Sequence, residues 1–95
     1  MQPFSPMTTF YETIAGDARI NTTHISLYMA LLQQWNLKQG NNPVSIKRGD
    51  IMKSAKISAR HTYNKYINEL HKYGYIEYLP SSNSLHNSIV YLKQL

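Results

Sequence analysis

The residues with the clearest chemical potential are lysines and arginines, and most of them lie in the middle of the chain. Eight of the ten basic residues fall between positions 38 and 72, where the only acidic residues are Asp50 and Glu69. The eight are Lys38, Lys47, Arg48, Lys53, Lys56, Arg60, Lys65 and Lys72. Cations gathered in this way release condensed counterions when they neutralise phosphates. The segment therefore predicts a polyanionic partner, and the alternative is an ordinary solvated basic surface.

The other polar residues form no catalytic or metal-binding pattern. The four histidines, at positions 24, 61, 71 and 86, have neither HExxH nor HxH spacing, and the chain has no cysteine. The five carboxylates are scattered and the four glycines are isolated, so neither an acid–base pair nor a phosphate-binding glycine loop is visible. Ser58 lacks an orienting acid that would make it a nucleophile. We therefore expect a protein that is not an enzyme and needs no cofactor or metal.

Length and composition restrict the protein to one small core. The 95 residues (11.0 kDa) suffice for one compact domain, and hydrophobic residues make up 42% of them. Charged residues make up 16%, below the roughly 25% of average proteins, because acids are few. The net charge is +5 and the pI is about 9.6. The first ten residues lack a secretory pattern and no segment approaches the roughly 18 apolar residues of a membrane span, so a cytoplasmic protein is expected.

Apolar periodicity and capping signals predict the elements that would position the basic residues. Helices are expected over 5–16, starting at Ser5 or Thr9, over 22–37, over 47–55, and over 58–73 with Ser58 as the N-cap and Gly74 as the stop. Residues 44–46, 75–79 and 88–92 have strand-forming composition, and a turn-rich stretch joins the last two. The predicted fold class is mainly α with a small β-hairpin (α+β).

The element order and a sequence motif resemble winged helix-turn-helix domains. Two helices joined by a short turn over 47–73 have the helix-turn-helix arrangement, and the strand 44–46 and the hairpin 75–92 would complete a winged helix. The runs 57–63, 67–70 and 73–76 match the family signature in which the recognition helix ends in ELxxxGYI, here residues 69–76. The chain resembles the N-terminal module of DnaD-like and phage replication-organiser proteins and small regulators of mobile elements. The resemblance implies a winged helix domain at 22–95, preceded by an N-terminal amphipathic helix and link at 1–21.

The same resemblance implies which residues contact DNA. In that family the recognition helix enters the major groove, where arginine pairs with guanine, asparagine with adenine, and lysine with guanine or a phosphate. The solvent face of helix 58–73 would supply Arg60, His61, Asn64, Lys65 and Asn68. Phosphate contacts are expected from the supporting helix and the turn, at Lys47, Arg48, Lys53 and Lys56, and further contacts from Ser58 and Thr62 at the start of the recognition helix. The alternative is the ordinary polar face that any amphipathic helix presents.

The function implied is sequence-specific binding of duplex DNA, as in a transcriptional regulator of a mobile element. The hairpin tip has no lysine or arginine, so a wing contact would depend on Asn83, His86 and the serines. An accessory role in replication or excision would use the same binding chemistry. A protein–protein adaptor is the alternative from another class, and it would favour exposed apolar anchors where this face has Arg, Asn, Lys and His.

The tyrosines raise two further expectations about the core. Tyr63, Tyr66 and Tyr73 share the apolar helical face, which favours core packing over base stacking. In segment 75–79, strand alternation predicts that Ile76 and Tyr78 point inward and Tyr75 outward.

The apolar residues of the first two helices raise the question of whether the chain pairs with a second copy. Met7, Phe10, Tyr11 and Ile14 in the first helix, with Leu27, Leu31 and Trp35 in the second, offer more apolar surface than one small core obviously uses. A homodimer through residues of helices 5–16 and 22–37 is one expectation, and a first helix folded back on its own domain is the other.

Overall fold

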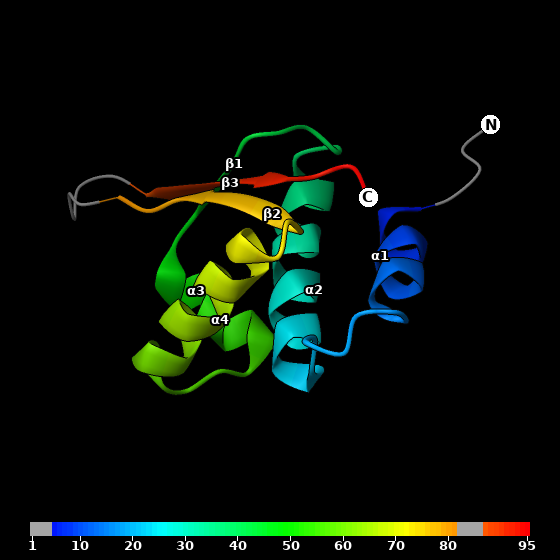
Figure 1. Cartoon of the computed structure of the whole chain (residues 1–95). Helices are drawn as coiled ribbons and strands as arrows, with labels where there is room; N and C mark the ends of the chain where they lie inside the picture. Colours follow the sequence, from blue (N-terminus) through cyan, green and yellow to red (C-terminus); the bar gives the residue numbers. More distant parts are fainter. Residues whose placement is uncertain (1–4, 82–86) are drawn as a thin grey trace.

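Four helices and a three-stranded antiparallel sheet make up the described part of the chain, residues 5–81 and 87–95 of a computed structural model. In chain order they are α1 (Pro6–Ile14), α2 (Thr22–Leu37), β1 (Val44–Ile46), α3 (Arg48–Ala55), α4 (Arg60–Lys72), β2 (Ile76–Leu79) and β3 (Ser88–Leu92). Figure 1 shows the sheet lying over α3 and α4, with α1 on the far side of α2 from these two helices. The α+β class is thus confirmed.

The sheet has the strand order β1-β3-β2, so β3 is central. Val90 of β3 lies opposite Val44 on one side and Tyr78 on the other. Before the start of β1, the Asn42 side chain continues the pairing with β3, since its Oδ1 accepts from the Leu92 N–H (3.0 Å) and its Nδ2 donates to the Leu92 carbonyl (2.9 Å). Alternate residues of each strand face the helices, as strand geometry requires.

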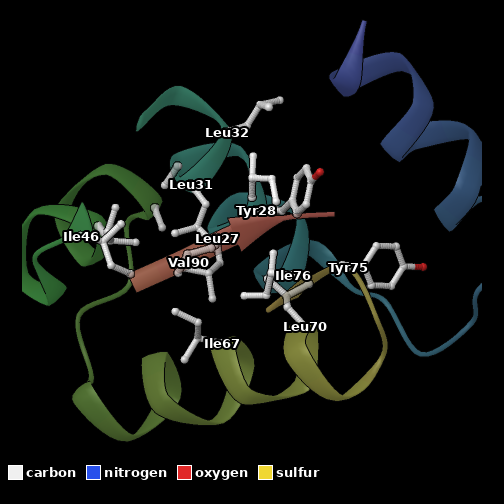
Figure 2. Close-up of a cluster of buried hydrophobic side chains, with 14 of the residues drawn as sticks. Leu27, Tyr28, Leu31, Leu32, Ile46, Ile67, Leu70, Tyr75, Ile76 and Val90 are labelled. Carbon is white, nitrogen blue, oxygen red and sulfur yellow. The ribbon is translucent and has the colours of Figure 1, made fainter. Parts of the chain in front are cut away.

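The core forms where α2, α3, α4 and the sheet meet. Leu27, Tyr28 and Leu31 of α2 are at most 1% exposed. Figure 2 shows Val90 and Ile76 of the sheet near Leu27, with Ile67 and Leu70 of α4 on the other side of the cluster. The wide apolar arc of α2 is therefore used largely by the chain's own core, because α2 is packed on several sides.

The first helix folds back on its own domain. Ser5 is its N-cap, with Oγ accepting from the Thr8 N–H, and Pro6 occupies the first turn. Phe10 is completely buried and its ring stacks on Tyr28 with centroids 3.8 Å apart. Met7 and Tyr11, 49% and 46% exposed, remain on the surface. The apolar surface that α1 offers to a second copy is thus smaller than its sequence stripe indicates.

The predicted N-cap of the fourth helix is wrong. The helix begins at Arg60, its N-cap residue is Ala59, and no side chain accepts a hydrogen bond from its first turn. Ile57 is buried in the core, and Ala59 still has extended dihedral angles (φ −100°, ψ 128°). Because burial of Ile57 fixes the path of the chain, the helix starts one residue later than it would with Ser58 as its N-cap.

The predicted outward position of Tyr75 is also wrong, and the end of α4 explains why. Gly74 has φ +90°, its N–H donates to the His71 carbonyl, and the Tyr75 N–H donates to the Leu70 carbonyl (2.9 Å). These two hydrogen bonds form a Schellman motif, in which the residue after the glycine makes a hydrophobic contact with the preceding helix. Strand alternation begins only at Ile76, so Tyr75 is 3% exposed and packs edge-on against Phe10.

Candidate nucleic-acid interface

The start of α3, the turn after it and one side of α4 present the predicted DNA-contacting residues to solvent. The exposed members are Lys47, Arg48, Lys53, Lys56, Ser58, Arg60, His61, Asn64, Lys65 and Asn68, whereas Thr62 is half-buried. The ion pairs found in residues 5–81 and 87–95 are Arg19–Asp17 and His24–Glu69, so none of these lysines and arginines pairs with a described carboxylate. We call this set, without Thr62, the basic face.

The α3–α4 turn is held by packing against α2. Ile51 and Ala55 of α3 are buried, and Ser26 Oγ of α2 donates a hydrogen bond to the Ala55 carbonyl. Lys56 ends α3 in the left-handed region (φ 62°, ψ 37°), and the Ile57 N–H donates to the Met52 carbonyl (2.9 Å). A left-handed conformation costs a residue with a Cβ roughly 1–2 kcal/mol, so Lys56 occupies a strained position that glycine would adopt more readily.

The helix α4 has a core side and a solvent side. Tyr63, Ile67 and Leu70 are buried, which confirms Tyr63 as a core residue. On the solvent side, Arg60 and Asn64 are successive neighbours one turn apart, about 6 Å along the axis. The Asn68 Nδ2 donates to the Asn64 carbonyl (2.7 Å), so this amide is already engaged with its own helix. Arg60 and Asn64 have the side chains best placed for an external hydrogen-bonding partner.

The N-terminus of α4 adds to the positive potential of the basic face. Its first turn has no acidic residue and no side-chain cap, and α3 likewise has no side-chain cap at Lys47. Uncapped helix N-termini expose N–H groups and the positive end of the helix dipole. An acidic residue is normally favoured there, but α4 begins with Arg60 and His61 instead.

A third side of α4 is fixed by the link between α1 and α2. We call this arrangement the clamp; it comprises Asp17, Arg19, Asn21 and His24, each of which contacts α4 or the turn that follows it. Asn21 Nδ2 donates to the Tyr66 hydroxyl (3.1 Å), and His24 Nε2 lies 2.7 Å from Glu69 Oε1. The Arg19 guanidinium lies 4.1 Å from the Tyr73 ring centroid. Tyr66 and Tyr73 are partly buried and pack against the core, as the sequence predicts, and the clamp adds a hydrogen bond to Tyr66 and a cation–π contact to Tyr73.

Asp17 and Tyr75 join the clamp to the start of β2. Asp17 accepts two hydrogen bonds from the Arg19 side chain (2.8 Å each) and one from the Tyr75 hydroxyl (2.7 Å). The hydrogen bonds from Arg19, and to a smaller extent the one from Tyr75, hold the pKa of the Asp17 carboxyl well below its usual range. Burial and the nearby Asp17 carboxylate raise the pKa of Tyr75 to about 12.

Sequence reasoning missed the clamp. Its members are 45 to 58 residues from their partners, and no helical or strand periodicity connects such distant positions. One signal was present: Asn21 directly precedes α2, and asparagine there is a strong N-cap.

At the other end of the molecule lies an open cavity of about 1040 Å³ between α1, the end of α2 and the last residues. Tyr28, Trp35, Leu92 and Leu95 contribute to its lining, which contains no acidic residue or histidine. Among the described residues, no group of three or more His, Cys, Asp or Glu side chains could hold a metal ion. None of the basic-face residues lines this cavity.

The hairpin tip, with Asn83, His86 and the serines 82 and 84, lies outside the described residues. Within the described part, no helix is long and apolar enough to cross a bilayer. No protein-family model, curated protein or solved structure matches the chain. The basic face is therefore interpreted from its own geometry and charge.

Proposed function

We propose that the protein is a winged helix-turn-helix that binds duplex DNA with sequence preference, in the manner of a transcriptional regulator. In this proposal α4 enters the major groove and α3 lies against the phosphate backbone. An α-helix fits the major groove, which is about 12 Å wide. The observation that carries the proposal is the basic face, where exposed cations without a described carboxylate partner surround a helix that is anchored on its other sides.

The topology supports the proposal. The strand β1, the helices α3 and α4 and the hairpin β2–β3 follow one another in the order expected of a winged helix, with β1 paired to β3 at one edge of the sheet. The supporting helix α3 packs against α2, and α4 packs against both α2 and β2. The solvent side of α4 is left exposed, as the insertion of a helix into a groove requires.

The side chains support a division of labour within the basic face. Arg60 can donate two hydrogen bonds to guanine, and Asn64 can pair with adenine. Lys47, Arg48, Lys53 and Lys56 lie on α3 or at its ends, where contacts with phosphates would fix the register of the helix on DNA. His61, Lys65 and Asn68 flank the two base-contacting residues, and Ser58 and Thr62 lie near the helix start.

The adaptor alternative has less support, because its apolar anchors would lie elsewhere. The exposed large apolar side chains of the described chain are Met7, Tyr11, Leu37, Leu79 and Leu95, and none belongs to α3 or α4. Met7 and Tyr11 are instead available to a second copy, so a homodimer through α1 is compatible with DNA bound at the other end. Roles in transcription and in replication or excision of a mobile element share this binding chemistry.

Fluorescence anisotropy with a labelled duplex of mixed sequence tests the proposal. Wild-type affinity should fall with salt at a log–log slope of about −0.9 per phosphate contacted. The double variant Arg60→Ala/Lys65→Ala should weaken binding and flatten the slope by about 1–2 units, whereas Lys93→Ala, which removes one positive charge after β3, should change neither measurably. Absence of wild-type binding, or equal effects of both variants, would contradict the proposal.

A further inference from the structure

From the contacts of the clamp, we infer that the His24–Glu69 hydrogen bond positions α4 for DNA binding, so that Glu69, although acidic, raises the affinity for DNA. The inference rests on the proposed function. Glu69 is the only acidic residue of α4, and an acid on a DNA-binding helix is expected to weaken binding by repelling phosphates. The role of Glu69 therefore depends on what its carboxylate contacts.

The direction of the hydrogen bond follows from the partners of His24. The imidazole is 1% exposed, and its Nδ1 accepts from the Asn21 backbone N–H (3.0 Å). Since an accepting ring nitrogen carries no proton, the proton of the neutral ring lies on Nε2 and is donated to Glu69 Oε1 at 2.7 Å. A carboxylate acceptor makes this a charge-assisted bond, which is stronger than a neutral one.

A second bond from the same helix end reaches α4 one turn earlier. Asn21 Oδ1 accepts from the Thr23 N–H (2.9 Å), while its Nδ2 donates to the Tyr66 hydroxyl (3.1 Å). Tyr66 and Glu69 are three residues apart, so they lie on one side of α4. The rings of His24 and Tyr66 also meet edge-on, with centroids 4.5 Å apart. The N-terminus of α2 thus holds one flank of α4 at two successive turns.

This flank adjoins the solvent side of α4 at Lys65, one turn before Glu69, and Arg60 and Asn64 lie farther around the same helix. Because the two bonds restrict rotation of α4 about its axis, they also fix the directions in which Arg60 and Asn64 project. Base contacts require side chains held to about 0.5 Å and 10–20°. The bond also holds the Glu69 carboxylate at His24, with 26% of its side chain exposed. Loss of the bond removes one of the restraints on the rotation of α4 and leaves the Glu69 carboxylate without its partner.

The test compares two opposite predictions for the affinity for DNA when a carboxylate is removed. Removing any carboxylate makes the protein more positive, and charge alone then predicts tighter binding to DNA. Glu77→Ala, an exposed acid of β2 with no described ion pair, is the matched charge control and should bind as tightly as wild type or tighter. Glu69→Ala should bind about three- to tenfold more weakly despite the same gain in charge, because the hydrogen bond is gone.

Two further variants separate positioning from charge and from folding. Glu69→Gln loses the same charge but keeps an oxygen that can accept from His24 Nε2, so it should restore at least wild-type affinity. Tyr66→Phe changes no charge, removes the acceptor of Asn21 Nδ2 and should weaken binding about two- to fivefold. Affinities are compared by anisotropy at a temperature where circular dichroism shows every variant folded, so that a purely structural role would lower the melting temperature without changing affinity.

The inference is overturned if Glu69→Ala binds as tightly as Glu77→Ala, or if Glu69→Gln is as weak as Glu69→Ala. Absence of DNA binding by the wild-type protein overturns the proposed function itself and this inference with it. The two failures are distinguishable, because the first requires a wild-type protein that binds.

Discussion

Two sides of α4 arrange their charges in opposite ways. On the flank that meets the clamp, Glu69 pairs with His24, and Arg19 lies over Tyr73 while bonded to Asp17. On the basic face, Arg60 and Lys65 have no described carboxylate partner. Cations without an anionic partner repel one another, and Lys65 Nζ contacts the Tyr66 ring of its own helix, 5.5 Å from the ring centroid. The His24–Glu69 hydrogen bond, in contrast, connects segments 45 residues apart. The comparison indicates that the flank holds the helix and that the face is arranged for an external anion.

The largest expected effects come from substitutions on the buried side and on the exposed side of α4, of which the first should lower stability and the second the affinity for DNA. Ile67→Ala, in the fully buried side of α4, should cost about 2–5 kcal/mol of the free energy of unfolding. Asn64→Ala, on the exposed side, should change stability by less than about 0.5 kcal/mol and reduce affinity for DNA by about 1–3 kcal/mol. Thermal unfolding and anisotropy on both variants check this, and a stability loss for Asn64→Ala similar to that of Ile67→Ala would remove the distinction.

At Lys56, a single substitution should keep or raise the stability of the fold while it weakens binding to DNA. Lys56→Gly relieves the left-handed strain but makes the unfolded chain more flexible, so the free energy of unfolding should rise by no more than about 1 kcal/mol or stay unchanged. The loss of one phosphate contact should flatten the salt slope by about 0.9. Lys56→Ala is the matched variant, because it loses the same cation but keeps a side chain in the left-handed conformation. Equal salt slopes for Lys56→Gly and wild type would remove Lys56 from the phosphate contacts.

The clamp should contribute the smallest effect, and its signature is a dependence on pH. Because the pKa of Asp17 is lower in the folded chain than in the unfolded chain, its contribution to stability is fully present above the unfolded value of about 3.9 and is lost as the pH falls toward the folded value. The difference in melting temperature between wild type and Asp17→Asn should therefore be constant from pH 7 to pH 5 and shrink below pH 4. A difference that grew at low pH would contradict the role of Asp17 as a hydrogen-bonded carboxylate.

The sequence was sufficient to predict the elements, because local patterns determine them. Apolar spacing located α2 and β1 at the observed boundaries, and Gly74 marked the end of α4 because only a left-handed residue closes that turn. Local patterns failed at Ser58 and Tyr75, where burial of a neighbouring or following side chain in the core overrode the cap and strand rules.

For the candidate site, the sequence predicted which residues are exposed but not what holds them. The family resemblance, charge and helical periodicity predicted eleven contact residues, of which ten are exposed and Thr62 is half-buried. The clamp depends on where the link between α1 and α2 meets α4, and a single sequence contains no pattern for that contact. Glu69 was therefore interpreted only as part of a family motif, without its partner His24.

The most direct test of the account is to titrate the ¹⁵N-labelled protein with a short DNA duplex and to map the amide shift changes by NMR. The account predicts that the largest changes fall on the basic face, at Lys47, Arg60, Asn64 and Lys65, and that Met7, Glu12 and other residues of α1 barely move. Shifts concentrated on α1 and the cavity end, or no shifts at all, would contradict it.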